Sequence, residues 1–200
     1  MTEVPLILAS SSSSRRRMLE AAGVVFTVVA PNMDEDLMKD VLAGSGAEAA
    51  IVADALAEAK AIAISERHGD ALVLGSDQVL RCGERIFNKA VDKSEAAATL
   101  LALKGAEHEL ISAAVIARAG VPIWRRTESA WLRMRDFSDE FLKEYLNAEL
   151  PDILGSVGCY RIEGRGAQLF SEVKGDQFCI RGLPLIPVLD ALRHFGVLAS

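Results

Sequence analysis

The sequence has few of the residues that build metal centres and disulfide frameworks. Its three cysteines are odd in number and widely spaced, and no Cys-x-x-Cys pair occurs. Buried, reduced thiols are therefore expected rather than a disulfide framework or a zinc site. The three histidines, His68, His108 and His194, are isolated from one another in the chain. This spacing disfavours zinc chemistry and catalytic triads that depend on histidine.

Long apolar runs and an excess of positive charge are also absent. No apolar stretch reaches the roughly 20 residues that a membrane helix needs. Residues 4–9 are apolar, but they follow no basic region and are too few for a secretory signal, so a cytoplasmic protein without a membrane partner is expected. The net charge of −6 disfavours binding to a nucleic-acid polymer, which needs a basic surface. A small anionic substrate needs only a few cations in one cleft.

The 200 residues, 50% hydrophobic and 25% charged, suffice for one hydrophobic core. Strands are predicted over residues 4–9, 24–29, 71–80, 108–118 and 122–134, and helices over residues 15–22, 47–67, 92–105, 138–148 and from Pro184 onward. Residues 31–46 are interpreted as an irregular acidic loop, and residues 155–181 as a glycine-rich segment with short strands. The pattern predicts a mixed α/β fold with a long sheet and helices packed around it.

The serine run that starts at Ser10 joins the first predicted strand to a helix and is a candidate anion site. A hydroxyl-rich turn at a helix N-terminus offers free backbone N–H groups and a favourable dipole. Helical spacing places Arg15 on the inward face with Leu19. Arg16 and Arg17 point elsewhere. An inward arginine needs a partner, and a phosphate is a good one. The alternative is a serine-rich cap with a solvated basic helix start.

Asp77 lies in the most hydrophobic of the predicted strands. A carboxylate in that position is costly unless it is paired, binds a metal or faces a cleft. Gly75 and Ser76 before it suggest a bulge or a close approach of another backbone. We interpret Asp77 as a functional residue. The alternative is an aspartate at a strand end that bonds to a neighbouring loop.

Further charged residues are less specific. Asp34, Glu35 and Asp36 supply hard oxygen ligands that suit magnesium or manganese, or they form a solvated loop. Lys60 lies on the flank of the predicted apolar stripe of its helix, at residues 52, 55, 56, 59, 62 and 63, where it could snorkel or reach a cleft. Lys89 follows an aromatic residue and could equally be a surface lysine.

Glycines concentrate near the end of the chain. Four of them between residues 155 and 166 permit close approach of the backbone to a ligand. Gly164 and Gly166 lack the third glycine of a dinucleotide fingerprint, and no Walker loop occurs anywhere in the chain. A dinucleotide-binding fold and a kinase are therefore disfavoured.

Taken together, these segments resemble the Maf family of nucleotide pyrophosphatases, in the right order and over nearly the whole chain. The matching segments are residues 6–10, 31–35, 57–61, 75–78, 87–89, 158–164 and 182–185. The chain departs from the family pattern at Ser13 and Ser14, where the family has proline and its first arginine, which leaves Arg15 as the phosphate-binding arginine. Ala90 replaces a further proline, and Ser112-Ala113 replaces a Thr-Gly pair.

The resemblance implies a single Maf-like domain over residues 1–200, with an extended mixed sheet flanked by helices and two lobes around a deep cleft, as in Maf proteins and inosine triphosphatases. It implies a homodimer that hydrolyses a nucleoside triphosphate to the monophosphate and pyrophosphate. Asp77 would be catalytic and, with Glu35, would bind Mg²⁺ or Mn²⁺. The residues expected to hold the phosphates are Ser10, Arg15, Lys60 and Lys89.

Glu163 indicates which base the substrate has. Family members that prefer thymidine and uridine triphosphates tend to have glutamine here, whereas the 7-methyl-GTP branch has Glu-Gly, as this sequence does. A glutamine amide donates and accepts, but a carboxylate only accepts, which suits the paired N–H donors of a guanine edge. The alternative is that Glu163 pairs with Arg161 or Arg165 and meets no base.

A regulator that binds a protein partner is the alternative function, because Maf proteins were also linked to inhibition of septum formation. Serine at position 14, in place of the family arginine, favours a degraded enzyme with weak or no turnover. Retention of Asp77, Lys60 and Lys89 favours an active one.

Overall fold

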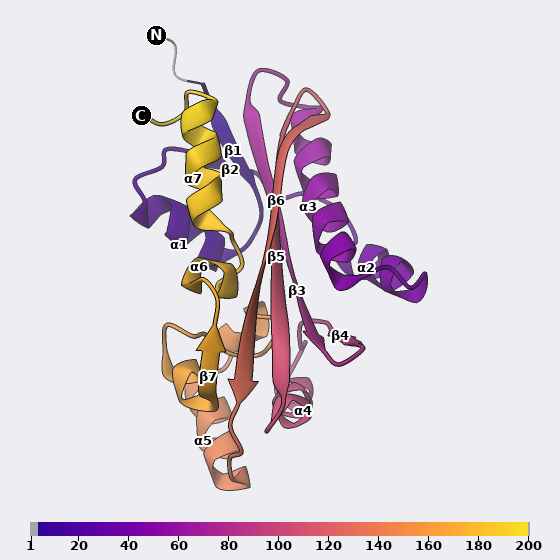
Figure 1. Cartoon of the computed structure of the whole chain (residues 1–200), viewed down its shortest axis with the longest axis vertical. Helices are drawn as coiled ribbons and strands as arrows, with labels where there is room; N and C mark the ends of the chain where they lie inside the picture. The colour runs from indigo at the N-terminus through magenta and orange to yellow at the C-terminus, as the bar shows by residue number, and fades with distance from the viewer. Residues whose placement is uncertain (1–3, 200) are drawn as a thin grey trace.

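The computed structural model describes residues 4–199, except for the side chains of Asp36 and Ala43 (Figure 1). A mixed seven-stranded sheet has the strand order β2-β1-β3-β5-β6-β7, with β4 paired to β3. The strands are β1 (Leu6–Ala9), β2 (Thr27–Val28), β3 (Leu72–Cys82), β4 (Arg85–Phe87), β5 (Glu107–Arg118), β6 (Val121–Met134) and β7 (Phe170–Lys174). β1 runs parallel to β2 and β3, and the other pairs are antiparallel. The predicted mixed α/β fold is confirmed.

Helices cover both faces of this sheet (Figure 1). They are α1 (Ser13–Ala21), α2 (Glu35–Gly44), α3 (Ala49–Ser65), α4 (Lys93–Leu103), α5 (Asp139–Glu149), α6 (Gln177–Ile180) and α7 (Leu185–His194). Successive side chains of a strand point to opposite faces. Accordingly, Ala113 and Val115 of β5 pack in the core under α3, whereas Ala114 and Ile116 pack in the core under α1 and α7.

The long strands β3, β5 and β6 join two lobes (Figure 1). One lobe holds β1, α1 and α7, and the other holds α4, α5 and β7 around a second hydrophobic core. Between the lobes one edge of β3 is uncovered, because pairing with β1 stops at Gly75 and pairing with β4 begins at Leu80. Among the described strands only β5 pairs with residues 76–79. The two predicted lobes therefore meet at a gap in the sheet edge beside Asp77.

The prediction of an irregular loop over residues 31–46 was wrong, since α2 occupies most of that segment. Asp34 Oδ1 accepts a hydrogen bond from the backbone N–H of Leu37 at 3.0 Å and so caps the first turn. Met38 and Leu42, four residues apart, pack against the core under α3. The many charges of the segment hid this apolar repeat in the sequence.

Two other predicted elements are smaller than expected. The strand over residues 24–29 shortens to the two residues of β2. Residues 155–181 contain one strand, β7, and otherwise form turns, the helix α6 and a 3₁₀ turn at Arg165–Leu169, and a further 3₁₀ turn at Asp152–Gly155 precedes them. Tight contacts between backbones replace strand pairing there: a Cβ at Gly166 would lie 2.4 Å from the carbonyl oxygen of Arg161.

The inward face of α3 is rotated from the predicted stripe. Its buried residues are Ala49, Val52, Ala53, Leu56, Ala57, Lys60, Ala61, Ile64 and Ser65. The alanines let α3 approach β3 so closely that a Cβ on Gly75 would lie 2.2 Å from the Ala57 carbonyl oxygen. The close approach predicted at Gly75 is thus confirmed, but Lys60 lies on the buried face and not on the flank.

Candidate functional site

A cleft of about 530 Å³ opens at the gap beside β3. It is lined by the serine turn and first turn of α1, by residues of β3, by Lys89 after β4, and by the segments 152–163 and 180–182. An adjoining hollow of about 320 Å³ extends toward α2 and shares Asp77, Gln78 and Lys89 with the cleft. The free edge of β3 is therefore the floor on which the two lobes converge.

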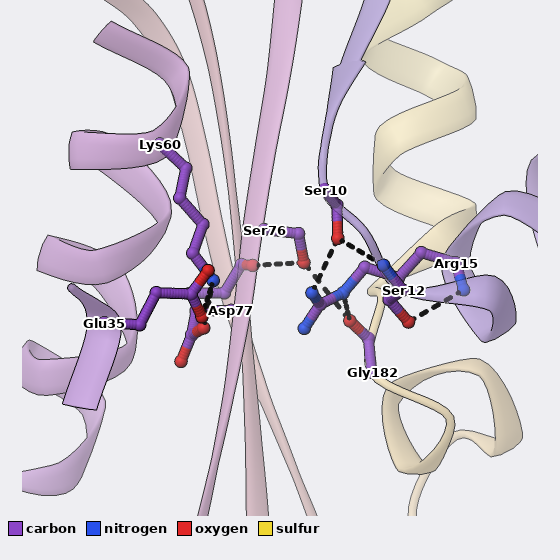
Figure 2. Close-up of polar contacts among 9 residues, drawn as sticks. Ser10, Ser12, Arg15, Glu35, Lys60, Ser76, Asp77 and Gly182 are labelled. Atoms are coloured by element: carbon purple, nitrogen blue, oxygen red, sulfur yellow. Dashed lines mark hydrogen bonds and ion pairs between the residues drawn. The ribbon is translucent and has the colours of Figure 1, made fainter. Parts of the chain in front are cut away.

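The buried ammonium group of Lys60 lies between two carboxylates (Figure 2). Its Nζ is 2.7 Å from Asp77 Oδ1 and 2.7 Å from Glu35 Oε2. Lys60 is 2% exposed and Asp77 is 8% exposed. Removing an ammonium ion from water costs several kcal/mol unless it is paired. Lys60 therefore stabilises two acids that would otherwise repel each other, and the three groups together keep one excess negative charge.

Arg15 lies on the other side of β3, where its guanidinium is fixed by the protein (Figure 2). Nε donates to the carbonyl of Gly182 at 2.7 Å, and Nη1 donates to Ser10 Oγ at 3.1 Å. Burial lowers the pKa of Arg15, while the charges of Asp77 and Glu35 act in the opposite direction. Among the described residues Nη2 has no hydrogen-bond acceptor, so this nitrogen can bind a ligand in the cleft.

The helical-face prediction for the three arginines is confirmed: Arg15 is buried, and Arg16 and Arg17 are exposed. The serine turn also has the predicted geometry. Ser12 is the N-cap of α1, and its hydroxyl accepts from the backbone N–H of Arg15 at 3.4 Å. Residues 11–14 all line the cleft, so the N-terminus of α1, where helical N–H groups lack partners within the helix, borders it.

Lys89 and Glu163 both line the cleft, but they differ in their contacts. Lys89 is exposed, and Lys39 of α2 fixes the nearby backbone by donating to the carbonyl of Phe87. Glu163 Oε1 forms a loose ion pair with Arg181 Nε at 3.7 Å. Within the described residues Glu163 pairs with neither Arg161 nor Arg165, so the alternative partners predicted for it were wrong.

The reason is that Arg161 is already held by other acids. Its Nη1 donates to Asp152 at 3.0 Å, and its Nη2 donates to Glu149 at 3.2 Å. Both acids belong to the end of α5 and the turn that follows it. Residues 161 and 163 therefore point their side chains to different partners, which sequence proximity alone did not reveal.

The sequence did not reveal that three polar residues of the sheet bind α6 and the residues that follow it. Gln78 Nε2 donates to the carbonyls of Cys179 and Ile180 at 2.9 and 3.1 Å, and Ser112 Oγ donates to Cys179 at 2.8 Å. Ser76 Oγ donates to the carbonyl of Gly182 at 3.2 Å. Their signal was polar side chains recurring in strands predicted to be buried, a pattern that requires hydrogen-bond partners.

Glu35 and Asp77 are suitable oxygen ligands for a divalent cation. Among the residues that the structure describes, no cluster of three or more His, Cys, Asp or Glu side chains could hold a metal ion. Magnesium often binds through one or two carboxylates and completes its shell with phosphate oxygens and water. The pair thus fits a cation that arrives with a phosphate-bearing ligand. Asp34 caps α2 instead, and the side chain of Asp36 lies outside the described residues.

Behind the cleft, Tyr160 is held by His108 of β5. His108 Nε2 lies 2.7 Å from Tyr160 Oη, and Phe170 contacts both rings. A Cβ on Gly158 would lie 2.3 Å from the ring of Tyr160, so this position accepts only glycine without rearrangement. Burial lowers the pKa of His108 to about 4. The imidazole is therefore neutral near pH 7 and supports the cleft wall.

These features define an α/β protein with a cleft lined by arginines, lysines and carboxylates between two lobes. The chain belongs to the Maf family: the family model for Maf-like protein matches residues 5–195. It is 47% identical over 193 residues to the nucleoside triphosphate pyrophosphatase of Granulibacter bethesdensis, covering 96% of this chain and 98% of that protein. It is 46% identical over 198 residues to the enzyme of the same name from Caulobacter vibrioides, covering 99% of each.

A third relative has a different name. The 7-methyl-GTP pyrophosphatase of Rhizobium meliloti is 44% identical over 193 residues, covering 96% of this chain and 97% of that protein. Relatives with both names therefore align over almost the full length of the chain. In the described part of the structure, every helix is too short or too polar to cross a bilayer.

We expect His108 to make the protein less stable as the pH falls from about 6.5 to about 4. The pKa of His108 is about 4 in the folded protein and about 6.5 in the unfolded chain. Between these values the unfolded state binds one more proton at His108 than the folded state does. The free energy of unfolding therefore decreases as the pH is lowered, by about 3 kcal/mol in total. Urea unfolding of the wild type and of His108→Gln across this range measures the difference.

The variant should lose this part of the pH dependence, whereas His68→Gln, at an exposed histidine, should keep it. Equal slopes for His108→Gln and the wild type would show that the protonation of His108 does not control stability.

Proposed function

We propose that this chain hydrolyses a nucleoside triphosphate to the nucleoside monophosphate and pyrophosphate. The main support is the buried Lys60, which holds Asp77 and Glu35 at the floor of the cleft. Arg15 lines the same cleft on the other side of β3. Acids and cations held this close suit a reaction in which water attacks phosphorus and negative charge builds up on the leaving group. Relatives named for this activity over the full chain length support the proposal.

The cations would position the triphosphate. Arg15 offers its Nη2, and Ser10 stabilises the guanidinium from behind. Lys89, exposed on the opposite lobe, and the N-terminus of α1 can reach the same anion. Lys60 is already bound to two carboxylates, so it would contribute by keeping them in place and by balancing their charge. Catalysis of this type depends mainly on positioning and charge neutralisation.

Asp77 would accept the proton of the attacking water. Lys60 donates to its Oδ1 and so orients the carboxylate, and Oδ2 is left for the water. The water oxygen bonds to the α-phosphorus, and the bond from that phosphorus to the bridging oxygen of the β-phosphate breaks. The electron pair leaves with pyrophosphate, and the water proton goes to Asp77.

A divalent cation is part of this proposal. Glu35 and Asp77 would hold Mg²⁺ or Mn²⁺ together with the phosphate oxygens. When bound, the cation would neutralise charge on the phosphates and the leaving group. The homodimer and the cytoplasmic location belong to the same proposal through the family resemblance.

The base would meet Glu163, which also lines the cleft. Its carboxylate only accepts hydrogen bonds, and its partner Arg181 is 3.7 Å away and forms no hydrogen bond with it. The carboxylate is therefore available to the N–H groups of a guanine edge. Relatives named nucleoside triphosphate pyrophosphatase and 7-methyl-GTP pyrophosphatase are similarly close to this chain, so guanine and 7-methylguanine triphosphates are the proposed substrates.

We expect Asp77→Asn to fold normally and to lose at least about 100-fold in kcat, since the amide cannot accept the water proton. Pyrophosphate release from a panel of nucleoside triphosphates, with Mg²⁺ or Mn²⁺, measures this loss. Asp54→Asn is the matched control, because Asp54 pairs with Arg125 away from the cleft. Near-normal turnover in Asp77→Asn would remove Asp77 from the mechanism. A wild-type protein without turnover would favour the regulatory alternative.

Replacing Glu163 by glutamine should change the base preference with little loss of stability. The wild type should prefer guanine or methylated guanine triphosphates to dTTP and UTP, and Glu163→Gln should narrow or reverse that order because an amide matches a pyrimidine edge. Ratios of kcat/KM across the four nucleotides measure the effect. A wild-type preference for dTTP, or unchanged ratios of kcat/KM in the variant, would refute the proposed role of Glu163.

A further inference from the structure

Arg181 is a cleft residue to which the proposed mechanism gives no role. It follows the last turn of α6 and lines the cleft, with 20% of its side chain exposed. Its buried Nε has no hydrogen-bond partner, and Glu163 at 3.7 Å is its one ion-pair partner among the described residues. A buried N–H group without an acceptor is costly, so a ligand that supplies acceptors would stabilise this side chain.

The backbone of Arg181 is held from several sides. Ser14 Oγ donates to its carbonyl at 3.1 Å, and Arg15 donates to the next carbonyl, that of Gly182, at 2.7 Å. On the other side, Gln78 holds the preceding carbonyl of Ile180 at 3.1 Å. Gly182 has a φ of +99°, a conformation that favours glycine and sets the direction of the chain at this point. The base of the Arg181 side chain is therefore fixed, while its guanidinium remains uncommitted.

The other arginines that line the cleft have partners. Arg161 is bound by two carboxylates, and Arg15 is bound by a carbonyl and a hydroxyl. Arg17 bonds to Ser13, and Arg16 forms an exposed ion pair with Glu20. Among the residues that the structure describes, Arg181 is thus a cleft arginine whose terminal nitrogens, like Nη2 of Arg15, have no hydrogen-bond acceptor and are left for a ligand.

The charge around Arg181 argues against a phosphate as that ligand. Glu163 neutralises the charge of Arg181, and its carboxylate would repel a phosphate oxygen. The triphosphate has a better position near Arg15 and Lys89, which have no such acid within ion-pair distance among the described residues. The Arg181 guanidinium donates and the Glu163 carboxylate accepts, and such a pair without net charge suits the edge of a base instead.

We propose that Arg181 determines the base specificity of the cleft by donating hydrogen bonds to O6 and N7 of guanine, while Glu163 accepts from N1–H and the exocyclic amine. The inference rests on the proposed function, because it requires a nucleotide in this cleft. Arginine binds O6 and N7 of guanine in a bidentate manner, because both atoms are acceptors and their separation matches that of two N–H donors of the guanidinium. A uracil or thymine base would place a carbonyl oxygen against Glu163 and lose that pairing.

The proposal separates guanine from 7-methylguanine. Methylation removes the N7 acceptor and leaves a positive charge on the ring, so the Arg181 guanidinium keeps only O6 and faces a like charge. Arg181 therefore favours GTP over 7-methyl-GTP.

Arg181→Met retains the length of the side chain and removes its donors. We expect kcat/KM for GTP to fall by roughly 5- to 150-fold, the value of a bidentate contact to a base. The value for dTTP should change by less than about twofold, and the ratio of 7-methyl-GTP to GTP should rise. Arg118→Met, at an exposed arginine that does not line the cleft, is the matched control and should leave all three values unchanged.

Equilibrium binding of GMP and dTMP tests the same residue without turnover. Arg181→Met should weaken GMP binding and spare dTMP. An equal loss for all three triphosphates would make Arg181 a phosphate ligand, and unchanged values for GTP and GMP would remove it from the site. Either result overturns the inference while pyrophosphate release by the wild type still supports the proposed function. Selective loss of GMP binding in a protein without turnover would instead support the inference and refute the hydrolase.

Discussion

The ion pairs of Lys60 are the interaction on which the candidate site depends. They join three elements, because Lys60 comes from α3, Asp77 from β3 and Glu35 from α2. The ammonium can reach both acids because alanines of α3 pack against Gly75, where a side chain would collide with the helix backbone. A buried ammonium and two carboxylates are each unfavourable alone, so each requires the others to stay in place. The geometry of the site is therefore a consequence of how α3 packs on the sheet.

The second constraint is the uncovered edge of β3. β1 ends opposite Gly75 and continues into the serine turn, whereas β4 begins opposite Leu80 and continues toward Lys89. Cations from both lobes are thereby delivered to the two sides of one gap. Ser76, Gln78 and Ser112 then fix α6 across the gap through its carbonyl oxygens, which places residues 180–182 on the cleft wall. Side chains of the sheet thus hold the backbone on both sides of Arg181 in position.

The sequence predicted the parts of this arrangement that depend on local periodicity. The inward direction of Arg15 followed from helical spacing, and the unusual position of Asp77 followed from the apolar strand around it. The burial of Lys60 was not predicted, because alanines mark the inward face of a helix less clearly than larger residues do. The pairing of Glu163 with Arg181 joins residues 18 positions apart on irregular segments, where no periodicity relates them. Charge likewise concealed α2, whose apolar residues contact α3 only in the folded chain.

In the proposed reaction, the cleft presents the α-phosphorus to a water molecule next to Asp77, on the side away from the leaving pyrophosphate. Hydrolysis of GTP in ¹⁸O-labelled water tests this arrangement most directly, because the products record which phosphorus was attacked. Mass spectrometry of the two products should find the label in the nucleoside monophosphate and unlabelled pyrophosphate. Label in the pyrophosphate, or release of inorganic phosphate as the first product, would contradict the proposed geometry.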